Sequence, residues 1–583
     1  MTRGLWPRRG ASCALLLTVL ALAVGCAEPE PAPPVVVVVS IDGMRADYLD
    51  RFGPQLEGGL RRLLDEGAVF ADALHDHANT ETAVGHATLL SGRHPAHTGI
   101  VANNYFDPSM HERRGFEEDR AERQLNGGRG ASPRLLIGSN LVDWLLREYP
   151  EGQVVALSGK ARVSILMGGH QARNVFWYSV ESGLFTTSTY YSDALPGWVE
   201  LFNQRRNARS FAGARWELLL GDEAAYSASR EDDFPGEVDH WALGRTFPHP
   251  LPGQDPELSR ALRDTPFVDE LTVELAEEAV RALDLGGDEA PDLLLVGLSA
   301  TDYIGHDFGP FSREVQDQIL RLDRLVGRLL ATLEERVGHD RLLVALVADH
   351  GMTPIPAQSV RDGQAARWVP IEPALAALGK ELDAELGTQG AVLGFENGVL
   401  YLDHQVIREA GADPEQMAAQ AAAALRSLDC AERVATRREI ESWQSAVDPI
   451  ARALRNAHHP ERGGDVYVVL AEGCQLFWNR FHEKDRAIAT SHGTPRPSDT
   501  HVPLILWGSG ILPGRYPQRV STVDLAPTLA ALLGVEPTEP LDGRVLDEAI
   551  DRVPVGHDGT SSPRRMKTGT EGARPIFEAG MTK

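Results

Sequence analysis

The sequence predicts an α/β fold in which a doubly wound, mostly parallel sheet is flanked by helices and carries an inserted α+β lobe. Short runs rich in Val, Leu and Ile alternate with helical patterns, which is typical of parallel strands buried on both faces of a sheet. In four of the five runs the polar residues cluster at or after the C-terminal end, where open α/β sheets bind ligands. The runs lie near 34–43, 153–159, 292–302, 341–351 and 501–510.

The connections between these runs follow helical and insertion patterns. The segment "FSREVQDQILRLDRLVGRLLATLEERVG" repeats apolar residues at helical spacing, from Val315 to Leu333, so it returns the chain from one strand to the next as a βαβ unit. Aromatic residues near 176–178 are expected to pack inside an insertion. The first part of the core is predicted at 35–352, with insertions at about 105–150 and 165–290. An inserted α+β lobe is predicted at 353–488, the last part of the core at 489–545 and a mobile tail at 546–583.

Composition limits the classes of function. The 583 residues are 43% hydrophobic and 24% charged, as in an ordinary globular protein, and the formal net charge is −26. Binding through the nucleic-acid backbone requires a basic stripe, so we do not expect it, and an anionic substrate would need a local cationic site. Cys430 and Cys474 are far from any metal-like cluster and are expected to form either a disulfide or two buried thiols.

The N-terminus reads as an export signal. Residues 1–26 combine a basic start, an apolar run too short to span a bilayer, and small residues before Cys26. The ending "AVGC" resembles a bacterial lipobox, which predicts acylation of Cys26 followed by a Pro/Glu tether at 27–34. The protein is then a periplasmic or outer-membrane-anchored lipoprotein whose only membrane attachment is this anchor. Plain secretion with cleavage nearby is the alternative.

Candidate metal ligands stand at the ends of the predicted strands. Each aspartate or histidine alone is commonly a satisfied polar group, but together they offer nitrogen and oxygen donors suited to Zn²⁺. Sites for Mg²⁺ or Ca²⁺ built from carboxylates would not require three histidines. The candidates are Asp42 in "SIDGMR", Asp302 and His306 in "SATDYIGHDFGP", Asp349 and His350 in "VADHGM", and His492 in "ATSHGTP".

A hydroxyl and two cations complete the candidate site. Thr82 precedes "AVGHATLLSG", so it lies at a predicted helix N-terminus, where it either acts as a nucleophile or merely caps the helix. Lys160 and Arg162 follow the run "GQVVAL"; if that strand continues, its period of two places both side chains on one face. The alternative is that the two cations are simply solvated.

These residues, in this order, resemble the zinc-dependent alkaline phosphatase superfamily, in the branch that includes PafA-type alkaline phosphatases and nucleotide pyrophosphatase/phosphodiesterases. The resemblance runs from about Val35 to about Gly543 and implies an alkaline phosphatase-like fold. The matching motifs are "VVSIDGMRADY", "TETAVGHATLLSG", "GIVANNYFD", "SGKARVSILMGGH", "FWYSVESGLFTTSTYY", "SATDYIGHDFGP", "VADHGM" and "SHGTP".

The resemblance implies two Zn²⁺ per chain and a role for each motif. It assigns Asp302, His306 and His492 to one Zn²⁺. The other is assigned to Asp42, Asp349, His350 and the Thr82 oxygen, with Thr82 as the nucleophile that forms a covalent phosphothreonine. Asn103 aligns with the family's phosphate-binding asparagine, although the adjacent Asn104 is an alternative. In the family, a Lys-x-Arg pair such as Lys160 and Arg162 is typical of the monoesterase branch.

The resulting prediction is an exported alkaline phosphatase that hydrolyses small-molecule phosphate monoesters with broad specificity. A nucleotide pyrophosphatase or phosphodiesterase on the same bimetallic core is the first alternative. A non-catalytic binding lipoprotein is the second. Neither the leaving group nor the oligomeric state is predicted.

Overall fold

The structure is a computed structural model that describes residues 34–107, 110–443, 448–477 and 488–551. The predicted export signal, Cys26, most of the tether and residues 552–583 of the predicted tail lie outside these ranges. Within the described residues, no helix is both long enough and apolar enough to cross a membrane.

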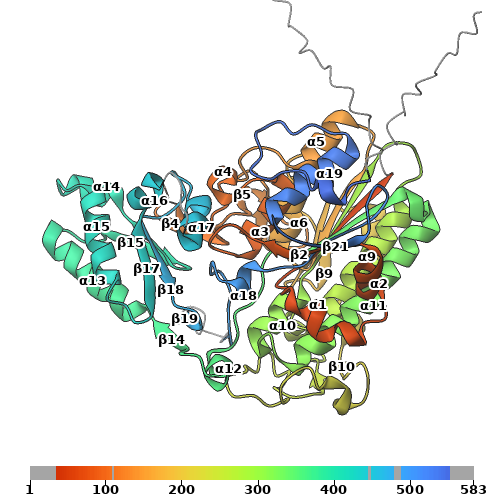
Figure 1. Ribbon diagram of the computed structural model, residues 1–583, viewed down its shortest axis with the longest axis horizontal. Helices are drawn as coiled ribbons and strands as arrows, with labels where there is room; N and C mark the ends of the chain where they lie inside the picture. Colours follow the sequence, from red (N-terminus) through yellow and green to blue (C-terminus); the bar gives the residue numbers. More distant parts are fainter. Residues whose placement is uncertain (1–33, 108–109, 444–447, 478–487, 552–583) are drawn as a thin grey trace, which may run out of the picture. The chain divides into compact units, whose positions relative to one another are not determined.

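A nine-stranded sheet lies at the centre of the fold and confirms the predicted α/β architecture (Figure 1). In spatial order its strands are β21 (Gly514–Ser521), β2 (Ala68–Leu74), β20 (Leu504–Gly508), β13 (Leu342–Val347), β1 (Val35–Ile41), β12 (Asp292–Leu298), β7 (Val154–Ser158), β8 (Asn174–Ser179) and β9 (Leu184–Thr186). The strands from β13 to β8 are parallel, whereas β20 and β9 pair antiparallel with their neighbours. All five predicted runs are therefore strands, and the sheet is mixed at its edges.

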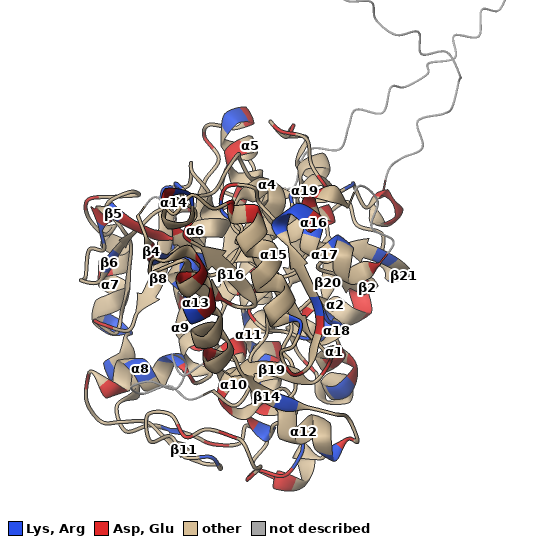
Figure 2. Cartoon of the chain, turned by 90° about the vertical axis from the view of Figure 1, so that its left-hand side faces the viewer, with Lys and Arg blue, Asp and Glu red and all other residues tan. Residues whose placement is uncertain are grey.

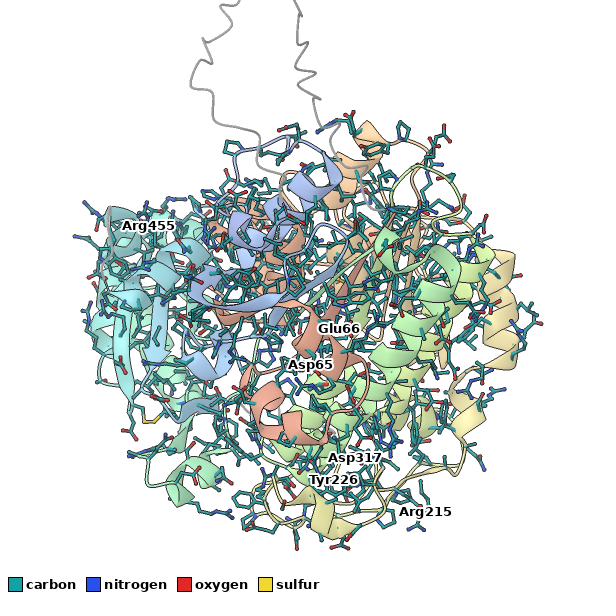
Figure 3. The ribbon with its side chains drawn as sticks, turned by 45° about the vertical axis from the view of Figure 1, so that its right-hand side comes forward. Asp65, Glu66, Arg215, Tyr226, Asp317 and Arg455 are labelled. Carbon is teal, nitrogen blue, oxygen red and sulfur yellow. A yellow bond between two sulfur atoms is a disulfide. The ribbon has the colours of Figure 1, made fainter. Side chains whose placement is uncertain are left out.

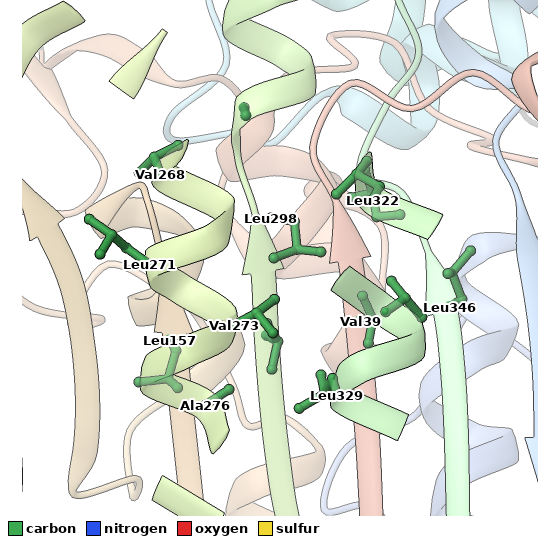
Figure 4. Packing of buried hydrophobic residues seen from close by; sticks show 14 of the residues in the cluster. Val39, Leu157, Val268, Leu271, Val273, Ala276, Leu298, Leu322, Leu329 and Leu346 are labelled. Carbon is green, nitrogen blue, oxygen red and sulfur yellow. The ribbon is translucent and has the colours of Figure 1, made fainter. Parts of the chain in front are cut away.

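Apolar side chains alternate to the two faces of the central strands, and helices cover both faces. Every residue of β1 is buried. On one face, Val39, Leu298 and Leu346 belong to the same buried cluster as residues of α9 (Phe267–Ala282) and α11 (Arg313–Val337), as Figure 4 shows. The predicted amphipathic helix is α11. The opposite face is covered by α3 (Thr82–Ser91), α5 (Leu141–Glu148), α6 (Ala161–Gly168) and α19 (Leu525–Leu533).

The predicted insertion at 165–290 is too broad. Strands β8 and β9 come from this range and extend the central sheet, and α9 covers one face of that sheet. Phe176 and Trp177 are neighbours on β8, so their side chains face opposite sides of the sheet and are buried in different core clusters. Strand β8 pairs in parallel with β7 and is part of the main sheet. These aromatic residues therefore belong to the main core and not to an insertion of their own.

The segment between the two parts of the core contains a second, antiparallel sheet, as predicted for an α+β lobe. Its order is β15 (Val392–Glu396), β16 (Val399–Leu402), β18 (Val466–Leu470) and β17 (Ala431–Thr436), and its helices include α13 (Glu372–Leu386), α14 (His404–Glu409), α15 (Pro414–Leu425), α16 (Arg437–Ser442) and α17 (Pro449–Ala457). Strands β14 (Arg367–Pro370) and β19 (Cys474–Phe477) form a separate pair. Cys430 and Cys474 form a disulfide, drawn in yellow in Figure 3, which decides between the two expectations.

The remaining elements surround the core. They include two hairpins, β3 (Asn104–Asp107) with β4 (Glu112–Gly115) and β5 (Glu118–Arg123) with β6 (Arg129–Ala131), and the helices α1 (Asp47–Phe52), α2 (Gly59–Glu66), α7 (Gly197–Arg205), α8 (Glu257–Arg263) and α10 (Ala300–Phe308). The predicted tail begins too early, because Leu546 and Ala549 are buried and Ile550 forms a bridge with Ile511. Lys and Arg are interspersed with Asp and Glu in the view of Figure 2.

Candidate active site

Five of the six predicted metal ligands lie at one edge of the central sheet, just after the C-terminal ends of its strands. Asp42 directly follows β1, Asp349 and His350 follow β13, and α10 carries Asp302 and His306 just after β12. Since β13, β1 and β12 are parallel neighbours, the segments that follow them emerge side by side. The order of the strands therefore brings together residues that are more than 300 positions apart in the sequence.

The first ligand group consists of Asp302, His306 and His492. Its donor atoms all lie within 4.8 Å of one another. Nε2 of His306 and Nε2 of His492 are each 3.4 Å from Oδ1 of Asp302. His306 is one helical turn beyond Asp302 on α10, whereas His492 comes from the loop before β20, so only the tertiary fold places it here.

The second ligand group consists of Asp42, Asp349 and His350, again with donors within 4.8 Å of one another. Nε2 of His350 lies 3.5 Å from Oδ1 of Asp42 and 3.3 Å from Oδ2 of Asp349. The other oxygen of Asp349 accepts hydrogen bonds from the backbone N–H groups of Gly43 at 3.1 Å and His350 at 3.0 Å. These bonds orient Asp349 so that Oδ2 faces the group.

All three histidines are held in the orientation that suits a metal ligand. Each Nδ1 lies 2.8 Å from a backbone carbonyl oxygen, and because a carbonyl only accepts, Nδ1 must carry the hydrogen. The lone pair of each ring is then on Nε2, the atom that faces the carboxylates. The acceptors for His306, His350 and His492 are the carbonyls of Thr490, Gly351 and Thr80. Burial lowers the pKa of His350 to about 3, which keeps its ring neutral.

The carboxylates fit a pair of divalent cations. Among the described residues, no hydrogen bond reaches Oδ1 of Asp42 or Oδ1 of Asp302. Oδ2 of Asp42 lies 2.7 Å from Nζ of Lys160, and Oδ2 of Asp349 lies 3.3 Å from Nε2 of His350. Burial and the charge of Asp349 raise the pKa of Asp42 well above its ordinary value. Buried, mutually repelling carboxylates beside imidazole rings form a mixed nitrogen and oxygen donor set that zinc accepts.

Thr82 lies beside the second group and is not a helix cap. It is the first residue of α3, and the N-cap residue is Glu81, whose side chain makes no capping hydrogen bond. The Thr82 hydroxyl oxygen lies 3.4 Å from Nε2 of His350. The capping alternative is therefore wrong, and the hydroxyl is directed toward the ligands.

Asn103, and not Asn104, reaches the site. Asn103 lines the pocket together with Thr82, and its Oδ1 accepts a hydrogen bond from the backbone N–H of Ala83 at 2.9 Å. Its amide oxygen is thus held at the start of α3. Asn104 is instead the first residue of the β3 hairpin.

Lys160 and Arg162 also line this pocket, which has a volume of about 600 Å³, but they do not share a strand face. Strand β7 ends at Ser158, Lys160 is the N-cap residue of α6, and Arg162 lies in the first turn of that helix. The prediction of a shared strand face is wrong because the strand ends two residues before Lys160 and the chain then begins a helix. Both residues still reach the pocket, since α6 begins at the carboxyl edge of the sheet.

The two cations have acidic partners and are therefore not simply solvated. Nζ of Lys160 lies 2.7 Å from Oδ2 of Asp42 and 2.5 Å from Oδ2 of Asp302. Although burial lowers the pKa of Lys160, these carboxylates raise it above its ordinary value, so the amine stays charged. Arg162 donates from Nη2 to Oε1 of Glu117 at 2.9 Å.

Sequence reasoning left the contacts of His86 undefined. Its Nδ1 donates to the carbonyl oxygen of Thr82 at 2.8 Å and lies 3.3 Å from Oδ2 of Asp349, and its Nε2 is 3.0 Å from the hydroxyl of Ser40. His86 therefore links the Thr82 segment to the second ligand group. Its position four residues after Thr82, on the same face of α3, was the available signal.

A third group of metal-type donors, His240, Asp264 and Asp307, is already in contact with other side chains. Its donors also lie within 4.8 Å of one another. However, Asp264 accepts hydrogen bonds from Nε of Arg263 and Nε1 of Trp241, each at 2.7 Å, and Nδ1 of His240 lies 2.7 Å from Oδ1 of Asp307. Because Arg263 already supplies the positive charge beside Asp264, we do not assign a metal here.

A mostly parallel sheet with two metal-ligand groups and a hydroxyl at its carboxyl edge defines a metal-dependent phosphohydrolase of the alkaline phosphatase-like class. The chain belongs to the type I phosphodiesterase / nucleotide pyrophosphatase family, whose sequence model matches residues 36–495. It is thus a hydrolase with phosphatase or phosphodiesterase activity, as expected from the resemblance of its motifs.

Individual relatives are alkaline phosphatases. The chain is 32% identical over 538 residues to alkaline phosphatase PafA of Elizabethkingia meningoseptica, covering 90% of this chain and 95% of the relative. It is 31% identical to alkaline phosphatase PhoV of Synechococcus elongatus, with 89% and 93% covered. The crystal structure of wild-type PafA superposes with a TM-score of 0.82 at 29% identity, covering 90% of this chain and all of that one. A murine ectonucleotide pyrophosphatase/phosphodiesterase, at 16% identity and a TM-score of 0.51, shares the fold.

Proposed function

We propose that the protein is an exported, zinc-dependent phosphomonoesterase that hydrolyses phosphate monoesters through a covalent phosphothreonine at Thr82. The observation that carries this proposal is that Lys160 and Arg162 line the same pocket as Thr82 and the first ligand group. Nζ of Lys160 also lies 2.7 Å from Oδ2 of Asp42 in the second group. A phosphate monoester has one more negative charge on its non-bridging oxygens than a diester. Two fixed cations stabilise that additional charge.

Asp302, His306 and His492 would hold one Zn²⁺, and Asp42, Asp349 and His350 would hold the other next to Thr82. Bound there, Zn²⁺ supplies Lewis-acid chemistry that lowers the pKa of a hydroxyl or water and neutralises charge on oxygen. The neutral state of His350 keeps its Nε2 lone pair available at neutral pH. The backbone bonds to Asp349 and to the three histidines hold the donors in place before a cation arrives.

Thr82 is assigned as the nucleophile. Its hydroxyl oxygen forms a bond to phosphorus while the ester P–O bond breaks, and the leaving group departs as an alcohol after taking up a proton. Water then attacks the phosphothreonine from the vacated side, which releases inorganic phosphate and restores the Thr82 hydroxyl. Asn103, whose amide oxygen is held at the start of α3 by Ala83, is assigned to contact a non-bridging oxygen during both steps.

Leaving-group specificity is proposed to be broad, because the assigned contacts all lie at the phosphoryl end of the pocket. The decisive measurement is the ratio of kcat/KM for an aryl phosphate to that for the matching bis-aryl phosphate, with Zn²⁺ supplied. A ratio well above one is expected. A ratio well below one would favour a nucleotide pyrophosphatase or phosphodiesterase, a candidate suggested by the family and by the acidic partners that offset the charges of Lys160 and Arg162.

The proposed compartment is the periplasm, with acylated Cys26 as the anchor. The Cys430–Cys474 disulfide supports an oxidising compartment. Metal analysis of the purified chain separates the enzyme from a non-catalytic binding lipoprotein: two Zn²⁺ per chain are expected for the enzyme. Fewer than one would favour the binding protein, although the retention of both ligand groups argues against it.

A further inference from the structure

The ring of Tyr303 contacts two cations at the edge of the active-site pocket. Tyr303 follows Asp302 on α10 and lines the pocket. Nζ of Lys160 lies 4.6 Å from the centroid of the Tyr303 ring, and Cζ of Arg263 lies 4.4 Å from it. Because the face of an aromatic ring carries partial negative charge, both contacts are attractive.

Arg263 is anchored so that it holds this ring. Its Nε and Nη2 donate to the two oxygens of Asp264, at 2.7 and 3.3 Å. Asp264 is fully buried and also accepts the indole N–H of Trp241. The planar guanidinium is therefore fixed by a two-point contact, and its charge is offset where it meets the ring.

The amine of Lys160 contacts two carboxylates and the ring of Tyr303. Its carboxylate partners, Asp42 and Asp302, are both assigned above as metal ligands. The ring of Tyr303 is a further contact of the Lys160 amine, and Tyr303 is not assigned as a metal ligand. A lysine is a point charge on a flexible four-carbon stem, so its position is set by the groups around it.

We propose that Tyr303, held by Arg263 and Asp264, is a positioning residue for Lys160 and so controls how strongly the site binds a phosphoryl dianion. This inference rests on the proposed function, because it assumes that Lys160 contacts the phosphoryl group. It assigns to Tyr303 no contact with the reacting atoms. Its effect must pass through Lys160.

The test is a double-mutant cycle on phosphate binding. The inhibition constant for inorganic phosphate and the kcat/KM values for an aryl phosphate and a bis-aryl phosphate are measured for Tyr303→Leu, Tyr303→Phe, Lys160→Ala and the double variant Lys160→Ala/Tyr303→Leu. Zinc content is determined for each variant. We expect Tyr303→Leu to weaken phosphate inhibition about tenfold and Tyr303→Phe, which keeps the ring, about twofold. Once Lys160 is absent, Tyr303→Leu should have no further effect.

Two outcomes would overturn the inference: additive effects of Lys160→Ala and Tyr303→Leu, or equal losses in Tyr303→Leu and Tyr303→Phe. If Tyr303→Leu loses zinc, the same cycle is measured with Arg263→Met, which leaves α10 intact. We then expect phosphate inhibition to weaken about threefold in Arg263→Met and no further effect of this substitution once Lys160 is absent. A wild-type enzyme that prefers the diester would refute the proposed function alone, because coupling in phosphate binding is measured separately.

Discussion

Replacing Lys160 and Arg162 together by alanine tests the monoester preference most directly. The side chain of Lys160 is 9% exposed, so we count it as one charge-assisted hydrogen bond worth about 1.5–3 kcal/mol. The side chain of Arg162 is 24% exposed and shared with Glu117, so we count about 1 kcal/mol for it. The sum of about 2.5–4 kcal/mol corresponds to a roughly 10²- to 10³-fold loss in kcat/KM for a phosphate monoester.

The same variant should lose about tenfold or less on a diester, because a diester lacks the additional negative charge that these cations stabilise. The assay compares initial rates on an aryl phosphate and a bis-aryl phosphate, with zinc content measured to confirm that both ligand groups are filled. Lys380→Ala with Arg438→Ala, two exposed cations of the lobe, is the matched control and should change neither rate. Equal losses on both substrates would refute the reasoning.

Three further outcomes are expected. Thr82→Ala should abolish turnover while retaining zinc, whereas Thr82→Ser should keep substantial activity; near-normal turnover of the alanine variant would contradict the nucleophile assignment. Burial raises the pKa of Asp269 to about 7, so between about pH 4 and pH 7 the folded state keeps a proton that the unfolded state has lost, and the unfolding free energy falls as pH rises. Asp269→Asn should make that slope shallower in urea unfolding of chelated protein, and an unchanged slope would contradict the assignment to Asp269. Cys430→Ser with Cys474→Ser should destabilise the lobe by about 2–4 kcal/mol in denaturant unfolding, and an unchanged midpoint would contradict this.

The ligand positions were predictable because strand ends carry a local signal. An apolar run that ends in polar residues marks both a buried strand and its carboxyl edge, which is how Asp42, Asp302 and Asp349 were found. The same local pattern misjudged residues near 176–178, since a strand at the side of the sheet and an insertion core both contain aromatic residues. Only the pairing of β8 with β7 shows that these aromatic residues belong to a strand of the main sheet and not to the core of an insertion.

The sequence by itself predicted the class of fold and the candidate donor residues, because these depend on periodicity and residue type, and the resemblance of its motifs pointed to Thr82 as the candidate nucleophile. The tertiary structure decided which donors meet: strand order places the β13 and β12 segments on either side of Asp42, and a loop close to β20 adds His492. It also replaced the assumed strand at Lys160 and Arg162 by a helix start, and it brought the ring of Tyr303 to Lys160. Such contacts depend on where separate elements cross in space, and local sequence patterns carry no information about that.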